Sequence, residues 1–504
     1  MSEEILIKSL IIKKILEKYK TIWAIGHLSS LGGWDMQTYM PKEGFEARSE
    51  AFAAISVLSQ KIFLDKEFVD LIESASKEVG LNDHERGILR LLNRQLKFYR
   101  NVPADFLEEF SKATTEGYAI WEKAKKNSDF QLFAPILDKI VRLARKKAEY
   151  LGYEEHPYNA LLDEYEEGMT VSDVEKYFDY IRPRLIELLK YIQRSDKYNT
   201  EHAIENESYD VKLMKKLNDD LLEFIHYNNT HLRIDVSPHP FTSTIGKGDT
   251  RITTRYEGKS FGNSYGSTMH EYGHALYELQ SHENLHYTPI SGGSSLVIHE
   301  SQSRFWENFV GRSKAFLSIF YESISKLSPA MENYSIDDIY QYLNNVKPSL
   351  KRVEADELTY HFHIMIRFEI EKMLFEDKIE ANDVPRIWNE KYESYLGVKP
   401  ENDAQGALQD VHWSGGSFGY FPTYSLGTAL SAMWKHCIEK DIGKIDELII
   451  NKEGIRKIQN WLKEKIHQYG STYTFKELVM KMTGEEFTPA YLINYLEHKY
   501  KNIY

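Results

Sequence analysis

The chain has 504 residues, of which 42% are hydrophobic and 28% are charged, as in an ordinary soluble globular protein. Its formal net charge of −13 argues against general binding to nucleic acid or to anionic membranes, because both carry dense negative charge. With one cysteine, Cys437, the chain cannot form an intrachain disulfide, which fits a reducing compartment.

The N-terminal stretch, residues 1–20, mixes charged residues into an apolar pattern at helical spacing. It lacks the uninterrupted apolar core of a signal peptide. No run of about 18 apolar residues occurs in the sequence, so no transmembrane helix is expected. We therefore expect a cytoplasmic protein.

The first half of the chain is expected to be helical. A helix over residues 3–20 leads into a glycine-rich turn over 28–41. Ser172 and Glu175 match a capping box, which opens a helix that runs toward Gln193 and that Pro183 kinks or divides. Further helices are expected over residues 46–77, 83–100, 104–126, 131–151 and 209–227.

The pattern then changes. Residues 232–236 alternate apolar and polar side chains, and residues 251–256 are rich in β-branched and aromatic ones, so both are expected to be short strands joined by a turn region. Helical patterns return near Val297 and over 336–346, 355–377, 384–395, 425–440, 453–468 and 488–501. Because no internal repeat or long linker interrupts the chain, we expect one largely helical domain over residues 1–504 with a small sheet.

The stretch GSTMHEYGHALYEL, residues 266–279, carries the strongest chemical signal. His270 and His274 lie four residues apart, which places both imidazoles on one face of a helix. Glu271 can reach a water at a metal held by that face, so the pattern predicts two zinc ligands and a general base. Ser267 or Thr268 is expected to cap this helix. Gly273, inside the motif, indicates close approach of a strand or of substrate to the backbone.

The expected strands come directly before this helix. A strand beside a metal-binding helix can hold an extended peptide by edge pairing. From the pattern alone, a purely structural hairpin is an equally good interpretation.

A catalytic zinc site usually has three protein ligands. The candidates downstream of the motif are Glu278, His282, Glu283, His286, His299 and Glu300. Glu300 is the best placed, because it follows His274 by 26 residues and lies on a new helix after a flexible connection. The alternative for Glu300 is an ordinary surface or ion-paired glutamate. His299 points about 100° away from Glu300 on that helix, and we interpret it as a substrate-binding or metal-supporting residue.

HEYGH, followed by HESQ at residues 299–302, resembles the thermostable carboxypeptidase 1 family, also called the M32 metallocarboxypeptidases. Other family motifs occur in order along the chain: the WD and MP elements near Trp34 and Pro41; H-P-F at His239, Pro240 and Phe241; D-x-R-x-T at Asp249, Arg251 and Thr253; G-x-x-Q-D-x-H-W at Gly406, Gln409, Asp410, His412 and Trp413; and FGYFPTYSLG at residues 418–427. The I-R-x-x-A-D motif departs at Lys351, which replaces isoleucine, and keeps Arg352, Ala355 and Asp356.

The resemblance implies a mainly α, zincin-like fold with a small β-sheet beside the H-E-x-x-H helix and a long substrate groove, commonly as a homodimer. It also implies one divalent metal ion, usually Zn²⁺ with Co²⁺ as a substitute, and release of C-terminal residues from peptides with broad specificity. The peptide substrates need a free C-terminus.

The site residues are assigned on this basis. His270, His274 and Glu300 are expected to bind the metal, and Glu271 to act as general base. His412, Tyr420 and Tyr424 are candidates to stabilise the oxyanion, although either tyrosine can equally be a packed aromatic residue.

Arg352 is the main candidate to bind the substrate carboxylate, with Arg251, His239 and His299 as weaker ones. The alternative for Arg352 is a structural ion pair with Asp356. At the level of function, the alternatives are an endopeptidase, dipeptidase or aminopeptidase with the same metal chemistry, or a non-catalytic helical peptide-binding protein.

Overall fold

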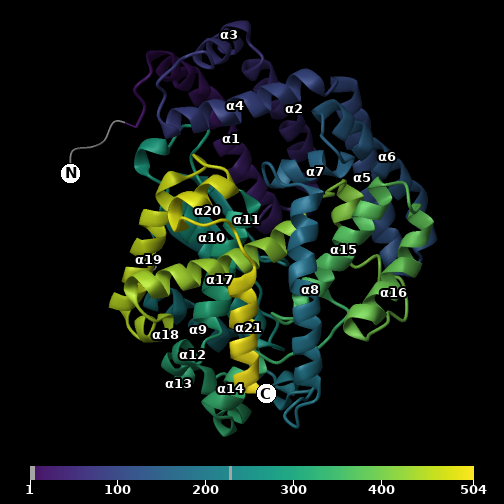
Figure 1. The fold of residues 1–504 in the computed structure, drawn as a ribbon, viewed down its shortest axis with the longest axis vertical. Coiled ribbons are helices and arrows are strands. Elements are labelled where there is room, and N and C mark those ends of the chain that lie inside the picture. Colours follow the sequence, from purple (N-terminus) through teal and green to yellow (C-terminus); the bar gives the residue numbers. More distant parts are fainter. Residues whose placement is uncertain (1–5, 226–229, 294) are drawn as a thin grey trace. The chain divides into compact units, whose positions relative to one another are not determined.

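The computed structural model describes residues 6–225, 230–293 and 295–504. The chain is mainly helical with one small sheet, as predicted (Figure 1). It divides into two compact units, each built from three separate segments: a first unit of Met1–Tyr99, His202–Leu343 and Trp434–Phe487, and a second unit of Arg100–Glu201, Asn344–Met433 and Thr488–Tyr504. The single domain over residues 1–504 stays a prediction.

The first unit contains the sheet and these helices: α1 Leu10–Thr38, α2 Phe45–Phe63, α3 Lys66–Ala75, α9 Val211–Phe224, α10 Phe261–Leu279, α11 Leu296–Arg304, α12 Lys314–Ile319, α13 Tyr321–Ser325, α14 Ile336–Leu343, α18 Ile445–Leu448, α19 Lys452–Lys465 and α20 Phe475–Thr483. A π-helix, Phe305–Gly311, continues α11.

The second unit contains α5 Ala104–Asn127, α6 Ala134–Leu151, α7 Pro157–Tyr165, α8 Val171–Gln193, α15 Tyr360–Phe375, α16 Val384–Leu396 and α21 Ala490–Ile503. Two helices, α4 Asp83–Asn101 and α17 Pro422–Ile442, have residues in both units.

The sheet has three strands, β1 Leu232–Val236, β2 Thr242–Gly246 and β3 Asp249–Thr254, in the order β1-β3-β2. β1 pairs with β3 in parallel, and β2 pairs with β3 antiparallel, with a register shift between Thr244 and Gly246. The strand predicted at 232–236 is confirmed, and the strand predicted at 251–256 is shifted to begin at Asp249. β2 lies within the predicted turn region, so that part of the prediction is wrong. β2 and β3 both contact α10.

The predicted glycine-rich turn over residues 28–41 is wrong, because α1 continues through Gly32 and Gly33 to Thr38. The helix predicted to begin at residue 3 begins at Leu10 as α1. Residues 3–5 of the predicted range lie outside the described part of the chain. Ser9 caps α1 by accepting a hydrogen bond from the backbone nitrogen of Ile12. α1 packs against α2 and α3. Buried apolar residues of α1, α3 and α4 pack together in one core, to which α1 contributes Ile12, Ile15 and Ile22.

The helix α8 begins with a capping box formed by Thr170 and Asp173, and not by Ser172 and Glu175 as predicted. Pro183 lies inside α8, which is continuous from Val171 to Gln193. The division that was one predicted effect of Pro183 is therefore wrong, and the kink stays a prediction. The predicted helix over 209–227 corresponds to α9, and its last positions, 226 and 227, fall outside the described residues.

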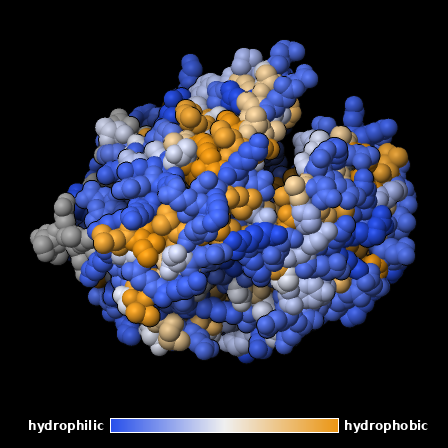
Figure 2. Space-filling model, turned by 90° about the horizontal axis from the view of Figure 1, so that it is seen from above, coloured by the Kyte–Doolittle hydropathy of each residue, from blue (hydrophilic) through white to orange (hydrophobic). Residues whose placement is uncertain are grey.

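The surface is mixed in character. Figure 2 shows one face on which hydrophobic residues form patches between hydrophilic ones. Among the exposed apolar residues, Phe45, Val57 and Leu58 lie on α2, with relative exposures of 59%, 51% and 50%. No helix among the described residues combines the length and the hydropathy that a bilayer crossing needs.

The close contact that Gly273 predicted is made with α11. A Cβ atom on Gly273 would lie 2.5 Å from the backbone oxygen of Gln302 and 2.7 Å from the Cα of Ser303. These separations are too short for any side chain. The neighbour is thus the backbone of a helix, rather than the strand or substrate that we expected, and the missing side chain allows α10 and α11 to approach.

We expect Gly273→Ala to destabilise the protein by about 1–3 kcal/mol, because the added methyl group overpacks the contact between α10 and α11. Gly26→Ala is the matched control, since Gly26 also lies in a helix but has nothing within 4 Å of its Cβ position. That control should gain up to about 1 kcal/mol from helix propensity. Urea unfolding measures both values, and equal stability of the two variants would contradict the packing role of Gly273.

Candidate metal centre and carboxylate-binding cluster

The helix α10 carries the two histidines. Ser260 caps it, because its hydroxyl accepts a hydrogen bond from the backbone nitrogen of Asn263. The cap predicted at Ser267 or Thr268 is wrong, since both residues lie inside the helix. The rings of His270 and His274 lie on one face, with their centroids 5.0 Å apart.

Glu300 on α11 completes a group of three ligand atoms. One of its carboxylate oxygens, Oε2, lies 3.6 Å from Nε2 of His270 and 3.7 Å from Nε2 of His274. In a tetrahedral zinc site with bonds of about 2.1 Å, two ligand atoms lie about 3.4 Å apart. The three side chains therefore have nearly the spacing that one metal ion needs. Among the described residues, no second group of three His, Cys, Asp or Glu side chains has its ligand atoms this close.

Each oxygen of Glu300 also accepts a hydrogen bond from a neighbour on the helix. Nε of Arg304 donates to Oε1 at 2.7 Å, and the hydroxyl of Ser303 donates to Oε2 at 3.0 Å. Glu300 is buried, so these bonds offset the cost of burying its charge. They also fix which oxygen faces the two histidines.

Glu307, on the π-helix, orients His270. Nδ1 of His270 donates to Oε2 of Glu307 at 2.9 Å, which leaves the lone pair of Nε2 for a metal. Arg312 and Arg304 donate to the same carboxylate at 2.6 and 3.3 Å. Burial opposes ionisation, but the two arginines hold the pKa of Glu307 far below its usual range. The sequence reading missed Glu307, although it follows Glu300 by two helical turns.

His274 is oriented by a different pair. Its Nδ1 lies 3.2 Å from Nδ1 of His299, and Nε2 of His299 lies 2.8 Å from Oε1 of Glu278. If Nε2 of His274 binds a metal, its Nδ1–H donates to His299, and His299 donates to Glu278. Burial lowers the pKa of His274 well below its usual value, so the neutral form that metal binding requires is favoured. This geometry favours a metal-supporting role for His299, and its predicted role in substrate binding stays a prediction.

Glu271 is held by the sheet. The hydroxyl of Thr242, the first residue of β2, donates to Oε2 of Glu271 at 2.6 Å. Burial raises the pKa of Glu271 above its usual range, while His270 and Thr242 oppose the shift. A carboxylate with a raised pKa is suited to accept a proton and then return it.

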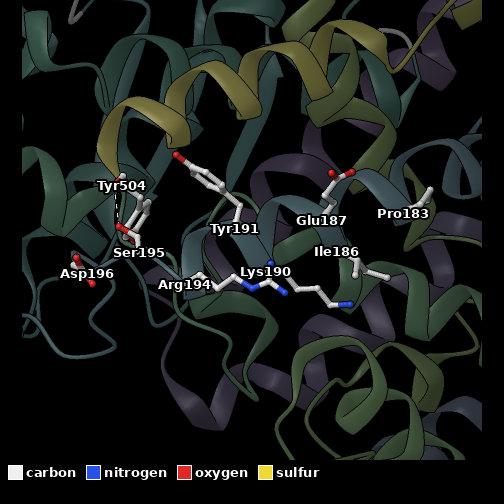
Figure 3. A pocket seen from close by; sticks show the side chains of 9 residues that line it. All are labelled: Pro183, Ile186, Glu187, Lys190, Tyr191, Arg194, Ser195, Asp196 and Tyr504. Atoms are coloured by element: carbon white, nitrogen blue, oxygen red, sulfur yellow. Dashed lines mark hydrogen bonds between the residues drawn. The ribbon is translucent and has the colours of Figure 1, made fainter.

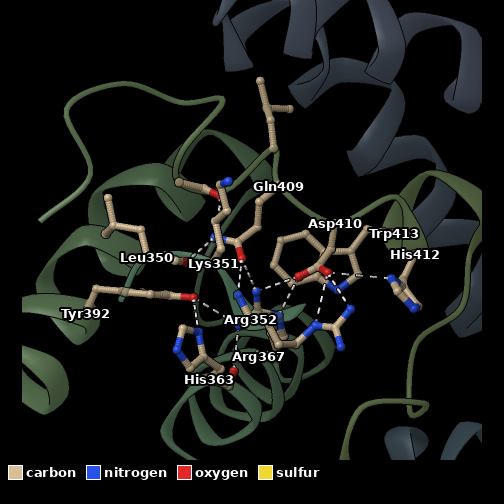
Figure 4. A network of polar contacts seen from close by, with 12 residues as sticks. Leu350, Lys351, Arg352, His363, Arg367, Tyr392, Gln409, Asp410, His412 and Trp413 are labelled. Atoms are coloured by element: carbon tan, nitrogen blue, oxygen red, sulfur yellow. Dashed lines mark hydrogen bonds and ion pairs between the residues drawn. The ribbon is translucent and has the colours of Figure 1, made fainter. Parts of the chain in front are cut away.

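Arg352 lies in a buried cluster of the second unit (Figure 4). Its Nη2 and Nε donate to Oδ1 of Asp410 at 2.9 and 3.1 Å. The ion pair with Asp356, the alternative considered above, is not present. Asp356 instead accepts hydrogen bonds from backbone nitrogens of Lys347, Leu358 and Thr359.

A second arginine, Arg367, shares Asp410 and was not found from the sequence. Its Nε donates to Oδ2 of Asp410 at 2.6 Å, and its Nη2 donates to Gln409 at 2.9 Å (Figure 4). Burial opposes ionisation of Asp410, but the two guanidinium groups hold its pKa far below the usual range. Two permanent positive charges against one negative charge leave the cluster with an excess charge of +1, which suits an anionic ligand.

Three candidates for oxyanion stabilisation lie beside this cluster. The rings of His412 and Tyr420 have centroids 5.5 Å apart, and those of Tyr420 and Tyr424 lie 5.2 Å apart. The Arg352 guanidinium lies 5.2 Å from the Tyr424 ring. Burial lowers the pKa of His412 to about 4 and raises that of Tyr424 well above 10. At neutral pH both side chains are uncharged hydrogen-bond donors.

The weaker substrate-binding candidates have other surroundings. Arg251 donates to both oxygens of Asp249 at 2.8 Å, and its guanidinium lies 4.2 Å from the Trp34 ring. His239 is exposed on the loop between β1 and β2. The substrate-binding roles of Arg251 and His239 stay predictions, as does the long substrate groove.

Two further cavities are found among the described residues. One of 1090 Å³ in the first unit follows the C-terminal half of α10 and includes Glu278. Another of 850 Å³ lies along the C-terminal half of α8 (Figure 3). Its lining includes Lys190, Arg194 and Ser195, and the Ser195 hydroxyl donates to the backbone oxygen of Tyr504 at 2.8 Å. None of the predicted site residues lines the α8 cavity, so we do not assign it to the reaction.

Comparison with known proteins identifies the family. Residues 14–500 match the family model described as Carboxypeptidase Taq (M32) metallopeptidase. The chain is 48% identical to thermostable carboxypeptidase 1 of Pyrococcus furiosus over 490 residues, which are 97% of this chain and 98% of that protein. It is 37% identical to carboxypeptidase 1 of Bacillus subtilis, with 98% of each chain covered.

Solved structures of carboxypeptidases have the same fold as this chain. The Pyrococcus furiosus carboxypeptidase structure described as "Apo-Mg" superposes with a TM-score of 0.96 at 47% identity, with 99% of this chain and 100% of that chain covered. Metallocarboxypeptidase 1 of Trypanosoma cruzi superposes with a TM-score of 0.92 at 35% identity, with 97% and 99% covered. The resemblance in the motifs is thus confirmed over nearly the whole chain. The chain belongs to the M32 family of metallopeptidases and is a metal-dependent carboxypeptidase.

Proposed function

We propose that His270, His274 and Glu300 hold one divalent metal ion, and that Glu271 acts as general base in hydrolysis of the C-terminal peptide bond, with broad specificity for the residue released. One observation carries this proposal: a single oxygen of Glu300 approaches Nε2 of both histidines, at 3.6 and 3.7 Å. Glu271 lies on the same helix and is fixed by Thr242.

The donor set favours Zn²⁺ as the native ion, with Co²⁺ as a substitute. Two imidazole nitrogens and one carboxylate oxygen match catalytic zinc sites that keep a position open. Magnesium instead prefers six oxygen ligands in an octahedral arrangement. When bound, the ion would acidify a water molecule and polarise the scissile carbonyl group.

The protein's own residues carry the proton. The other oxygen of Glu271, Oε1, takes a proton from the attacking water, and the raised pKa of the carboxyl group favours holding that proton until the amine leaves. Thr242 holds the carboxylate by donating its hydroxyl hydrogen. The carboxyl group then returns the proton to the leaving nitrogen, which restores the ionised base.

The negative oxygen of the tetrahedral intermediate needs hydrogen-bond donors. We assign this role to His412, Tyr420 or Tyr424. All three residues lie in family motifs. The pKa values of His412 and Tyr424 also support the role, because near pH 7 both side chains are uncharged and each has a hydrogen to donate.

Arg352 is proposed to bind the C-terminal carboxylate of the substrate, with Arg251, His239 and His299 as weaker candidates. The excess charge of the cluster with Asp410 and Arg367 supports this assignment. A planar guanidinium can bind a carboxylate through two parallel hydrogen bonds.

We also propose that the enzyme works in the cytoplasm as a homodimer on peptides, without nucleic-acid or membrane partners. The single cysteine and the net charge of −13 support this setting. The exposed apolar side chains of α2 offer a surface for a second copy.

We expect Glu307→Gln to weaken metal binding about 10- to 100-fold, because the variant loses the anion that fixes the Nδ1 proton of His270. Chelator competition, read by the metal content of the protein, measures this without reference to turnover. Glu283→Gln is the control, since its side chain is 64% exposed. If Glu307→Gln retains metal as tightly as the control, His270 is not positioned as proposed.

We expect Arg352→Gln to reduce kcat/KM for a free-acid peptide about 10- to 100-fold, since a charge-assisted bond contributes about 1.5–3 kcal/mol. Mass spectrometry of the free-acid and C-terminally amidated forms of one peptide should show a ladder from the free acid only. Arg386→Gln is the control in the second unit, because Arg386 is exposed on α16. An unchanged preference for the free acid in Arg352→Gln would remove Arg352 from substrate recognition.

A further inference from the structure

One face of α15 holds the segment of residues 409–421. Arg367 and Glu371 lie four residues apart on this helix and are fully buried. Arg367 contacts the start of the segment, through Gln409 and Asp410. Glu371 contacts it further on, so one face of α15 binds the segment at two separate points.

Glu371 accepts three hydrogen bonds. Nε1 of Trp413 donates to its Oε1 at 2.7 Å, and the backbone nitrogen of Gly419 donates to its Oε2 at 2.8 Å. The hydroxyl of Tyr158 on α7 donates to the same Oε2. Trp413 directly follows His412, and Gly419 directly precedes Tyr420. One buried carboxylate therefore holds the chain beside two of the three proposed oxyanion donors, His412 and Tyr420.

The backbone at Gly419 has a left-handed conformation and lies close to α7. Its φ angle is +89°, and a Cβ atom there would lie 2.7 Å from the backbone of Leu161. Only glycine fits this turn, in which the backbone N–H points at Glu371. Burial raises the pKa of Glu371 to about 7, while the three donors and Arg367 stabilise its ionised form.

We propose that Glu371 is a positioning residue of the carboxypeptidase reaction, which holds His412 and Tyr420 in place through Trp413 and Gly419. This inference rests on the oxyanion role proposed for those two side chains. A glutamine in its place has only one oxygen. It can accept from Trp413 or from Gly419, and its NH₂ group then faces the other donor. The segment must shift to relieve that contact.

We expect Glu371→Gln to lower kcat about 10- to 100-fold, because a shift of about 1 Å in a reacting group has an effect of this size. KM should change little, since Arg352 and Asp410 keep their ion pair. Metal content under chelator competition should equal that of the wild type, because His270, His274 and Glu300 belong to the first unit.

Glu357→Gln is the matched control. Glu357 is also a buried carboxylate of the second unit, and it accepts from Nζ of Lys499 at 2.6 Å and from Tyr495. Both variants replace one buried carboxyl group by an amide, but only Glu371 contacts residues 413 and 419. Thermal unfolding gives the folded fraction, and kcat is expressed per folded molecule. Equal kcat in the two variants would overturn the proposal.

A double variant provides a second test. Trp413→Phe keeps an aromatic ring and removes the N–H donor, so it should lower kcat in the same way as Glu371→Gln. Combined, the two changes should cost less than the sum of the single effects, because both act on the bond between Trp413 and Glu371. Fully additive losses would contradict the proposal. A wild-type enzyme without metal-dependent release of C-terminal residues would instead contradict the proposed function.

Discussion

The contact between α10 and α11 at Gly273 is the constraint on which the metal centre depends. Two histidines on one helix face supply only two ligands, so a third must come from another element. Since Gly273 has no side chain, the backbone of Gln302 and Ser303 can lie against α10. Glu300, on the same turn of α11, then reaches both histidines.

Buried charge is arranged in the same way in both units. In the first, Glu307 binds Arg304 and Arg312 and also orients His270. In the second, Asp410 lies between Arg352 and Arg367. Both oxygens of each carboxylate accept hydrogen bonds, which offsets the cost of burying the charge. Each carboxylate also holds a side chain to which we assign a role in the reaction. The anions thus hold the cationic and imidazole side chains in one geometry.

The helices, and the grouping of the three proposed ligands, were predictable from the sequence. The spacing of His270, Glu271 and His274 predicts the ligand pair and the base, and the interval to Glu300 on a new helix predicts the third ligand. Most helices follow from their apolar period. Thr242, Glu307, Arg367 and Glu371 were missed, because each acts through a contact with a residue that is distant in sequence or on another turn. Strand β2 was missed because its five residues lie between proline and glycine signals, and α1 was cut short because Gly32 and Gly33 indicate a turn.

The most direct test of the account is a comparison of Glu271→Gln with the wild type in metal content and in release of C-terminal residues. The account predicts equal metal content, because Glu271 is not a ligand, and a kcat lower by about 10²- to 10⁴-fold, because the general base is lost. Full turnover by the variant at equal metal content would contradict the assignment of Glu271 as the base.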